Sequence, residues 1–456
     1  MRGQTGSWQE TIVALATPPG RSAIAVVRLS GPATRSALAR VAPGLREPID
    51  PRRATLATIT DETGDAIDQG LITLFPAPAS YTGEDCAEIS VHGSPAVVAR
   101  LLAALNRCGA RLARPGEFTE RAFLRGKLDL PRAEAVIDLI EARTVAAARR
   151  SFHRIEGGLS RRLQGTREDL LTAAAQLDAA IDFSEDVGDA ALGEAARRLR
   201  TAIDDLERLA ATHETGRLLR AGCRAVILGR PNAGKSTLFN ALVGSARAIV
   251  TEIPGTTRDT LEAGIDVEGI PVTLVDTAGL RETKDVVERL GVERARQEGS
   301  IADVVLYVLE AAAGMTDEDH KAIASAGARR VLRVANKIDR ATAEQTAAAE
   351  DAGAMAICGL APDAGEKLRG LLAREISAGL DMEASDEVLA TLRQRDLVER
   401  SRAAAAEGLA TLSRGDSPEY AAAQVHDALD AMADLFGETT AEDVLERIFS
   451  AFCVGK

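Results

Sequence analysis

The stretch GRPNAGKS, residues 229–236, decides the fold of the middle of this chain. It follows an apolar run at residues 225–228 and precedes a segment of helical periodicity that begins near Leu238. A glycine-rich turn between a buried strand and a helix is the P-loop pattern, in which backbone N–H groups face phosphate oxygens at the helix N-terminus. Lys235 adds a cation, and the Ser236 hydroxyl is a Mg²⁺ ligand. The pattern predicts a phosphate-binding α/β domain.

Two further motifs follow in the order and spacing of a guanine-nucleotide site. The DTAG motif at residues 276–279 ends the next apolar strand, which places a carboxylate near Mg²⁺ and a glycine N–H near the γ-phosphate. The NKID motif at residues 336–339 follows a third strand. Its Asp339 carboxylate can accept hydrogen bonds from N1–H and the exocyclic amine of guanine, which adenine lacks. We therefore predict that the site binds GTP rather than ATP.

Leu280 follows the DTAG motif, where Ras-like GTPases carry a glutamine that orients the attacking water. Because leucine cannot polarise water, either hydrolysis is very slow or other groups manage the water and the phosphate charge. The candidates are Asn232, the loop at residues 251–259, and the acidic residues Glu282 and Glu288.

The chain is acidic and long enough for about two to four domains. It has 456 residues, with 55 Lys and Arg against 68 Asp and Glu, and a formal net charge of −13. Aromatic residues make up only 3%, which argues against a surface that stacks single-stranded bases on rings. Phosphate affinity comes from local Lys and Arg, so any contact with nucleic acid must be a local patch.

The five cysteines are scattered, without a Cys-x-x-Cys pair, and support neither a disulfide framework nor a zinc site. No stretch approaches the roughly 20 apolar residues of a membrane span. We expect a cytoplasmic protein.

The sequence changes texture along its length. Residues 1–123 mix short β-rich runs with turns, and residues 128–216 have a helical pattern. Residues 222–379 alternate expected strands with helices, and the helical pattern returns after residue 385. The return predicts that the α/β unit is inserted into one helical domain. The alternative is two separate small bundles. The expected fold class is therefore multidomain α/β, with an α+β N-terminal domain, an α-helical central domain and an inserted Ras-like P-loop GTPase domain.

Several segments together resemble the tRNA modification GTPase family MnmE, also called TrmE. They are GRPNAGKS, PGTTRD at 254–259, DTAGLR at 276–281, the terminal FCVGK at 452–456, and, near the start, ATPPGR at 16–21 and RPGEF at 114–118. The resemblance covers the whole chain. It implies a homodimer with a tetrahydrofolate-binding domain at residues 1–125, a discontinuous helical domain at 126–216 and 385–456, and an inserted G domain at 217–384.

The same resemblance implies a GTPase that K⁺ activates when two G domains pair. K⁺ would be bound by Asn232, Thr251, Ile253 and Thr256, and Mg²⁺ by Ser236 and Thr257, while Glu288 matches the family's catalytic glutamate. The implied GTP-binding residues are Asn232, Ala233, Gly234, Lys235, Ser236, Thr237, Thr251, Glu252, Ile253, Pro254, Gly255, Thr256, Thr257, Asp276, Thr277, Ala278, Gly279, Asn336, Lys337 and Asp339. One departure stands at Cys358-Gly359, where the family usually has Ser-Ala contacting guanine, largely through backbone.

In the N-terminal domain, Arg28, Glu88 and Lys127 match folate-binding positions, with Lys456 contributing from the C-terminus. The ligand would be tetrahydrofolate in its 5,10-methylene or 5-formyl form. Cys453 would be a catalytic nucleophile or acid, with a buried inert thiol as the alternative. We interpret His92 and the other four histidines as structural.

The family works with an FAD-dependent partner, MnmG (also GidA), in a heterotetramer or larger complex, and FAD belongs to the partner only. It installs an aminomethyl or carboxymethylaminomethyl group at C5 of the tRNA wobble uridine, with the carbon from methylene-tetrahydrofolate. We expect GTP hydrolysis to open and close the G-domain dimer.

Two alternatives stay open. A ribosome-assembly GTPase of the Era or EngA sort shares the G motifs but lacks PPGR and the FCxGK end, and a folate enzyme with a purely structural G domain conflicts with the intact motifs. Basic runs could contact tRNA phosphates, but we interpret them as solvated helix faces. These runs are Arg149, Arg150 and Arg154; Arg161 and Arg162; and Arg197, Arg198 and Arg200.

Overall fold

The computed structural model describes residues 10–46, 48–245, 248–249, 261–276, 301–327, 330–378, 380 and 387–456. Contacts divide the chain into two compact units. One comprises Met1–Ile137 with Asp430–Lys456, and the other comprises Asp138–Leu429. The sequence assigned all of residues 385–456 to the helical domain, and those domain boundaries stay a prediction.

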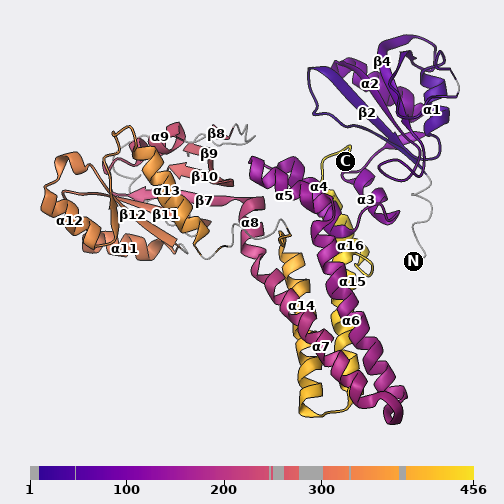
Figure 1. The fold of residues 1–456 in the computed structure, drawn as a ribbon. Helices are drawn as coiled ribbons and strands as arrows, with labels where there is room; N and C mark the ends of the chain where they lie inside the picture. Colours follow the sequence, from indigo (N-terminus) through magenta and orange to yellow (C-terminus); the bar gives the residue numbers. More distant parts are fainter. Residues whose placement is uncertain are drawn as a thin grey trace. The chain divides into compact units, whose positions relative to one another are not determined.

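The first unit is built on a six-stranded sheet with the order β3-β4-β5-β2-β1-β6. Figure 1 labels its strands β2 and β4 beside the helices α1 and α2. Its strands are β1 Thr11–Leu15, β2 Ser22–Ser30, β3 Thr55–Thr60, β4 Ala66–Phe75, β5 Cys86–Gly93 and β6 Ala110–Leu112. Helices α1 (Thr34–Val41) and α2 (Pro95–Arg107) cover one face, over a core that includes Val27 and Ile89. Because side chains alternate along a strand, the neighbouring residues Arg28 and Glu88 lie on the opposite face.

The C-terminal end of the chain packs within this same unit. Helix α16 (Glu442–Ser450) contacts α3 (Glu117–Leu124), and the rings of Phe449 and Phe123 are 6.1 Å apart. Beyond α16, the amide of Phe118 donates to the carbonyl of Lys456 at 3.2 Å. Gly116 has a φ of 68°, and a Cβ there would lie 2.4 Å from the carbonyl oxygen of Phe449. The RPGEF turn at residues 114–118 thus receives the end of the chain.

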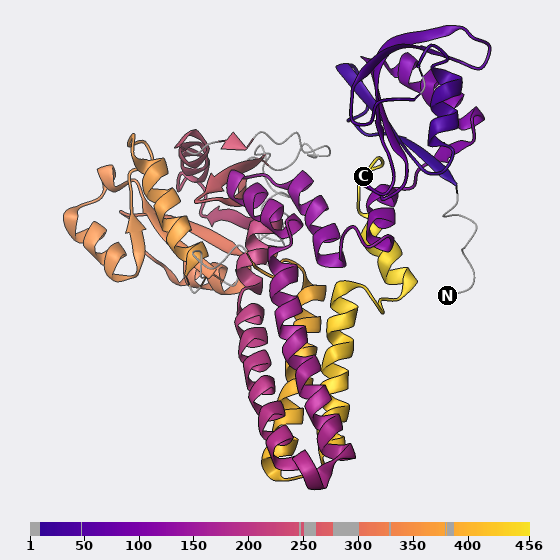
Figure 2. The same ribbon diagram turned by 45° about the vertical axis from the view of Figure 1, so that its right-hand side comes forward.

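Long helices form the helical part. They are α4 Leu130–Glu141, α5 Val145–Ile155, α6 Gly158–Asp182, α7 Ser184–Ala211, α8 His213–Ala221, α14 Leu392–Arg414 and α15 Pro418–Phe436. Helix α7 packs against both α6 and α14 in a bundle of long helices (Figure 2). Ser401 of α14 donates to the carbonyl of Ala428 in α15 at 3.0 Å. The helical stretches before and after the α/β region therefore pack together, and the alternative of two separate bundles is wrong. Among the described residues, none of the helices combines the length and the apolar composition that a membrane span requires.

The α/β region is a seven-stranded sheet with the order β13-β12-β11-β7-β10-β9-β8. The strands are β7 Cys223–Gly229, β8 Ala248–Ile249, β9 Leu261–Val267, β10 Ile270–Asp276, β11 Val304–Glu310, β12 Arg330–Asn336 and β13 Ala354–Ala356. Its helices are α9 Lys235–Ser245, α11 Asp317–Ala326, α12 Ala343–Asp351 and α13 Ala364–Ser377, with a 3₁₀ turn, η2, at Ile338–Arg340. Strands β10, β7, β11 and β12 are parallel neighbours, so the P-loop, Asp276 and the NKID motif meet at the carboxyl edge of the sheet.

One core lies on each face of this sheet. Leu238 of α9 and Leu368 of α13 belong to one, and Ala326 of α11 and Ala349 of α12 belong to the other. The chain enters the sheet from α8 and returns beside it, where the amide of Leu389 donates to the hydroxyl of Thr212 at 3.1 Å. The expected fold class, including the inserted α/β unit, is confirmed.

Candidate nucleotide site and N-terminal cleft

The P-loop joins β7 to α9 and takes a shape that its glycines make possible. Gly229 and Gly234 have φ values of 145° and 93°, and a Cβ would lie 2.0 Å from the carbonyl oxygen of Val308 and 2.2 Å from an Asn336 nitrogen, respectively. The Lys235 ammonium donates to the carbonyls of Gly229 and Arg230 at 2.9 and 2.8 Å, which holds it over the loop. Burial lowers the pKa of Lys235, while the charge of Asp276 opposes that shift.

Two residues with oxygen atoms suited to Mg²⁺ lie side by side: Ser236 in the first turn of α9 and Asp276 at the end of β10. The Ser236 hydroxyl donates to Oδ2 of Asp276 at 2.8 Å, and Asp276 is buried. Hydroxyl, carboxylate and phosphate oxygens are the ligands that Mg²⁺ prefers in nucleotide sites. These two residues fit that ion.

Asn336 ties the guanine side of the site to the P-loop. It is buried, its amide nitrogen donates to the carbonyl of Ala233 at 2.9 Å, and its amide oxygen accepts from the backbone of Gly359 at 2.9 Å. A Cβ at Gly359 would lie 2.8 Å from the Leu238 side chain, so this loop approaches closely through backbone. Asp339 keeps 46% of its side chain exposed and remains accessible to a base.

Lys337 links the P-loop to β11. Its ammonium donates to the carbonyl of Asn232 at 2.5 Å and forms an ion pair with Glu310 at the end of β11. Asn232 and Lys337 are both in the left-handed region, with φ of 62°. Sequence reasoning missed Glu310, because a lone glutamate at a strand end carries no signal of its own.

The four residues expected to bind folate line one cleft of about 490 Å³ in the first unit. The other lining residues are Arg52, Phe75, Ala79, Ser80, Tyr81 and Cys86. Arg28 and Glu88 are directly opposite each other on β2 and β5 and form an ion pair of 2.8 Å. The Arg28 guanidinium also lies 5.9 Å from the ring centre of Tyr81. The aromatic residues Phe75 and Tyr81 were not expected from the sequence.

The C-terminus completes this cleft. Arg28 donates to the carbonyl of Gly455 at 3.1 Å, across 427 positions of sequence, and Lys456 lines the cleft beside it. Burial and then the charge of Arg28 lower the pKa of Lys456. The Lys127 ammonium donates to the carbonyl of Pro78 at 3.0 Å. The lining of the cleft therefore presents four cationic side chains, Arg28, Arg52, Lys127 and Lys456, around the Glu88 carboxylate.

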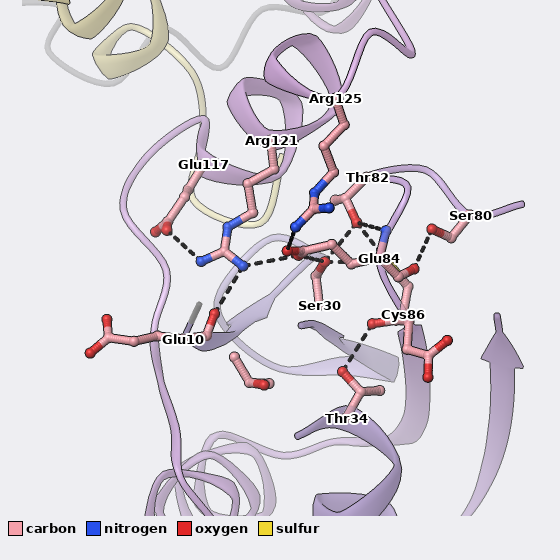
Figure 3. Close-up of polar contacts among 12 residues, drawn as sticks. Glu10, Ser30, Thr34, Ser80, Thr82, Glu84, Cys86, Glu117, Arg121 and Arg125 are labelled. Atoms are coloured by element: carbon pink, nitrogen blue, oxygen red, sulfur yellow. Dashed lines mark hydrogen bonds and ion pairs between the residues drawn. The ribbon is translucent and has the colours of Figure 1, made fainter. Parts of the chain in front are cut away.

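A buried network of ion pairs supports the wall of the cleft (Figure 3). Arg121 is 1% exposed and donates to Glu84 at 2.9 Å and to Glu117 at 3.0 Å. Glu84 also accepts from Ser30 at 2.6 Å and from Arg125 at 2.5 Å. These contacts fix α3 and the residues that follow Tyr81. Burial would raise the pKa of Glu117, but hydrogen bonds from Arg111 and the Arg114 backbone, with the charge of Arg121, lower it.

Two family models match this chain. The model of the GTP-binding protein TrmE N-terminus matches residues 11–127, and that of the MnmE helical domain matches residues 130–453. The tRNA modification GTPase MnmE of Aquifex aeolicus is 40% identical over 453 residues, covering 98% of this chain and 100% of the relative. That of Azoarcus sp. is 45% identical over 460 residues, covering 98% of each. The chain belongs to the MnmE family.

A solved structure of an Aquifex aeolicus Era variant bound to GDP.AlF4- is also similar, with 25% identity and a TM-score of 0.27. The match covers 40% of this chain and 66% of that one. Because the MnmE relatives match nearly the whole chain, the Era-like alternative is not favoured.

Part of the MnmE site expected from the sequence lies outside the described residues. This part comprises Thr251, Glu252, Ile253, Pro254, Gly255, Thr256, Thr257, Thr277, Ala278, Gly279 and Glu288. Of the expected K⁺ ligands, Asn232 is described, and of the expected Mg²⁺ ligands, Ser236 is described. Thr237 follows them in the first turn of α9.

Cys453, in the terminal motif of the MnmE resemblance, is exposed. The alternative of a buried inert thiol is therefore wrong. Its carbonyl accepts from Gly116 at 3.4 Å and from the Lys456 amide at 3.3 Å. The thiol that lines the cleft is Cys86, which is buried.

Several arginines of the basic runs form ion pairs with residues of a neighbouring helix. Arg154 is buried against Asp138 at 2.7 Å, Arg162 pairs with Asp205 at 2.7 Å, and Arg198 pairs with Asp169 at 2.8 Å. In this MnmE member, Arg198 is exposed and Arg162 is half-buried, which fits the expected solvated helix faces, whereas the burial of Arg154 contradicts that expectation.

Proposed function

We propose that this chain is a K⁺-activated, Mg²⁺-dependent GTPase that modifies C5 of the tRNA wobble uridine. An FAD-dependent partner of the MnmG (GidA) type shares the reaction, and methylene-tetrahydrofolate supplies the carbon of the aminomethyl or carboxymethylaminomethyl group. The observation that carries the proposal is the presence, in one chain, of a P-loop site with a guanine motif and a cleft with the four expected folate residues.

The nucleotide half of the proposal rests on preorganised polar groups. Lys235 is already held over the loop, and the Ser236 and Asp276 oxygens are already adjacent. Such groups stabilise the charge of phosphoryl transfer without having to reorganise during the reaction. The exposed Asp339 carboxylate would accept hydrogen bonds from guanine, and Glu288 would position the water that attacks the γ-phosphate.

The folate half rests on the size and chemistry of the cleft. A volume of about 490 Å³ lies within the range of small-molecule sites. The Glu88 carboxylate can accept from adjacent pterin N–H groups, and Arg28, Lys127 and Lys456 can hold carboxylates. The rings of Phe75 and Tyr81 offer flat apolar surface to an aromatic ligand.

K⁺, when bound, would supply positive charge beside the phosphates, where other GTPases use an arginine finger. Asn232 is the described residue of this proposed site. GTP turnover in KCl against NaCl tests it: we expect faster turnover in KCl and loss of that difference in Asn232→Ala. Equal rates in the two salts, or an unaltered K⁺ response in the variant, would contradict the K⁺ proposal.

We further propose that the chain works as a cytoplasmic homodimer and joins its partner in a heterotetramer or larger assembly. In that assembly, Cys453 would act as nucleophile or acid during transfer of the carbon. Light scattering of the protein alone and with the partner measures the assembly. Reconstituted modification of tRNA by Cys453→Ser measures the role of the thiol, and full activity would exclude it.

A further inference from the structure

Arg230 of the P-loop forms an ion pair with Asp319, which lies outside the three nucleotide motifs; we call this pair the latch. Asp319, in the first turn of α11, is fully buried, and five hydrogen bonds converge on its carboxylate. The Thr316 amide and hydroxyl donate to it at 2.8 and 2.9 Å, and the Tyr307 hydroxyl donates at 2.8 Å. Arg230 supplies the other two, from Nε at 2.8 Å and from Nη2.

The charge at this site is balanced within the pair. Burial would raise the pKa of Asp319, but the hydrogen bonds from Arg230, Thr316 and Tyr307 lower it to about 2. The carboxylate is therefore ionised near neutral pH. Its bidentate contact fixes both the position and the plane of the Arg230 guanidinium.

Arg230 is itself a P-loop residue, which makes the contact relevant to the nucleotide. Its carbonyl accepts from the Lys235 ammonium at 2.8 Å and from the Ala233 amide at 3.3 Å. Its side chain points to α11 while its backbone holds the phosphate-binding lysine. The contact of the Arg230 side chain with Asp319 therefore restrains the backbone of the loop that must face the phosphates.

The P-loop pattern leaves the Arg230 position open, because phosphate binding requires only the glycines, the lysine and the hydroxyl residue. An arginine with a buried carboxylate partner is therefore additional to the phosphate chemistry. Holding a loop in its binding conformation lowers the entropy that ligand binding must remove. The latch should therefore raise the affinity for the nucleotide by slowing its dissociation.

We propose that Asp319 is a positioning residue of the nucleotide site: through Arg230 it pins the P-loop and sets the rate of GDP release. The inference rests on the proposed nucleotide function and adds to it a residue on α11, outside the three nucleotide motifs.

The test compares Asp319→Asn, Arg230→Met and the double variant in the full-length protein. Stopped-flow measures dissociation of a fluorescent GDP analogue, and calorimetry measures the affinity for guanosine, which lacks phosphates. We expect GDP dissociation to accelerate on the order of tenfold in each single variant, as for a lost charged hydrogen bond. Guanosine affinity should stay within about twofold, and the double variant should release GDP no faster than the faster single variant.

Arg230→Met removes the latch but keeps Thr316 and Asp319, so the capping box that these two residues form at the start of α11 stays intact. It carries the test if Asp319→Asn fails to fold. Arg217→Met is the matched control: it removes ion pairs of 3.0 Å with Asp303, just before β11 in the same sheet, and of 2.8 Å with Glu214 in α8. We expect this control to leave GDP dissociation unchanged.

Unchanged GDP dissociation in Arg230→Met would overturn the latch. So would an equal loss of guanosine and GDP affinity, which indicates general damage to the domain, or additive effects of the two substitutions. A parent protein that binds no GDP would instead refute the proposed function.

Discussion

The nucleotide site and the N-terminal cleft are built in opposite ways. In the nucleotide site, each motif is a short run at the end of one strand, and the parallel sheet brings the P-loop, Asp276 and the NKID motif together. In the cleft, Arg28, Glu88, Lys127 and Lys456 come one at a time from distant positions. A site made of contiguous runs can be recognised from its residues, whereas a site made of single residues depends on the packing that assembles it.

The largest effect should come from breaking the buried ion-pair network of Arg121, Glu84 and Glu117 beside the cleft. Arg121→Met leaves the Glu84 and Glu117 carboxylates buried without their shared partner, which we expect to cost about 3–5 kcal/mol of unfolding free energy. Hydrogen exchange of the first unit measures the loss. Arg107→Met, which removes an exposed pair with Glu62, should cost under about 1 kcal/mol. Equal protection in both variants would contradict the structural role of the network.

A substitution in the P-loop should lower GTP turnover and leave folate binding in the cleft unchanged. Lys235→Ala removes a cation aimed at the phosphates, and we expect GTP turnover to fall about 10²- to 10³-fold. Folate binding, measured by calorimetry, should be unchanged. Lys367→Ala on α13, which removes an exposed pair with Asp363, is the control and should keep full turnover. A Lys235→Ala variant with normal turnover would refute the phosphate role.

The converse experiment changes the cleft and leaves the P-loop intact, by substituting Lys456 at the C-terminus. Lys456→Ala should weaken binding of 5-formyl-tetrahydrofolate about 10- to 100-fold, because a charged hydrogen bond is lost. GTP turnover without tRNA should not change. Arg100→Ala, on the covered side of the sheet at an exposed pair with Asp61, should bind folate normally. Parental affinity in Lys456→Ala would remove this residue from the proposed site.

The pH dependence of folate binding gives the smallest and most specific effect. The pKa of Lys456 is lowered from 10.5 by burial and by Arg28, so the ammonium loses its proton at a lower pH than an ordinary lysine. An anionic ligand favours the protonated form, so its affinity should fall as pH rises through that lowered pKa, by at most about tenfold per unit. Lys456→Arg should remove this decline, since arginine stays charged. An identical pH profile in the variant would assign the titration to another group.

The residues of the nucleotide motifs were expected from sequence, and those in the described part of the chain lie where the motifs place them. Ser236 and Asp276 are in contact, and Asn336 reaches the P-loop. The latch was not expected, because Asp319 stands in an ordinary capping pattern and Arg230 at a position that the motif leaves open. Only the fold shows that they meet.

The folate residues were expected from family resemblance alone. Each is a common residue type without a local pattern, and neither composition nor spacing joins position 28 to position 456. The network of Arg121, Glu84 and Glu117 was also invisible, because charged residues are exposed in most proteins and sequence does not reveal which ones are buried.

The sequence by itself determined the P-loop domain, the preference for guanine and the order of helical and mixed regions. These properties follow from local patterns, in which glycine, lysine and carboxylate act within a few residues of one another. The tertiary structure alone decided that the last residue lies beside β2 and that α11 holds the P-loop. Both depend on long-range packing, where burial and charge pairing select partners that chain distance does not indicate.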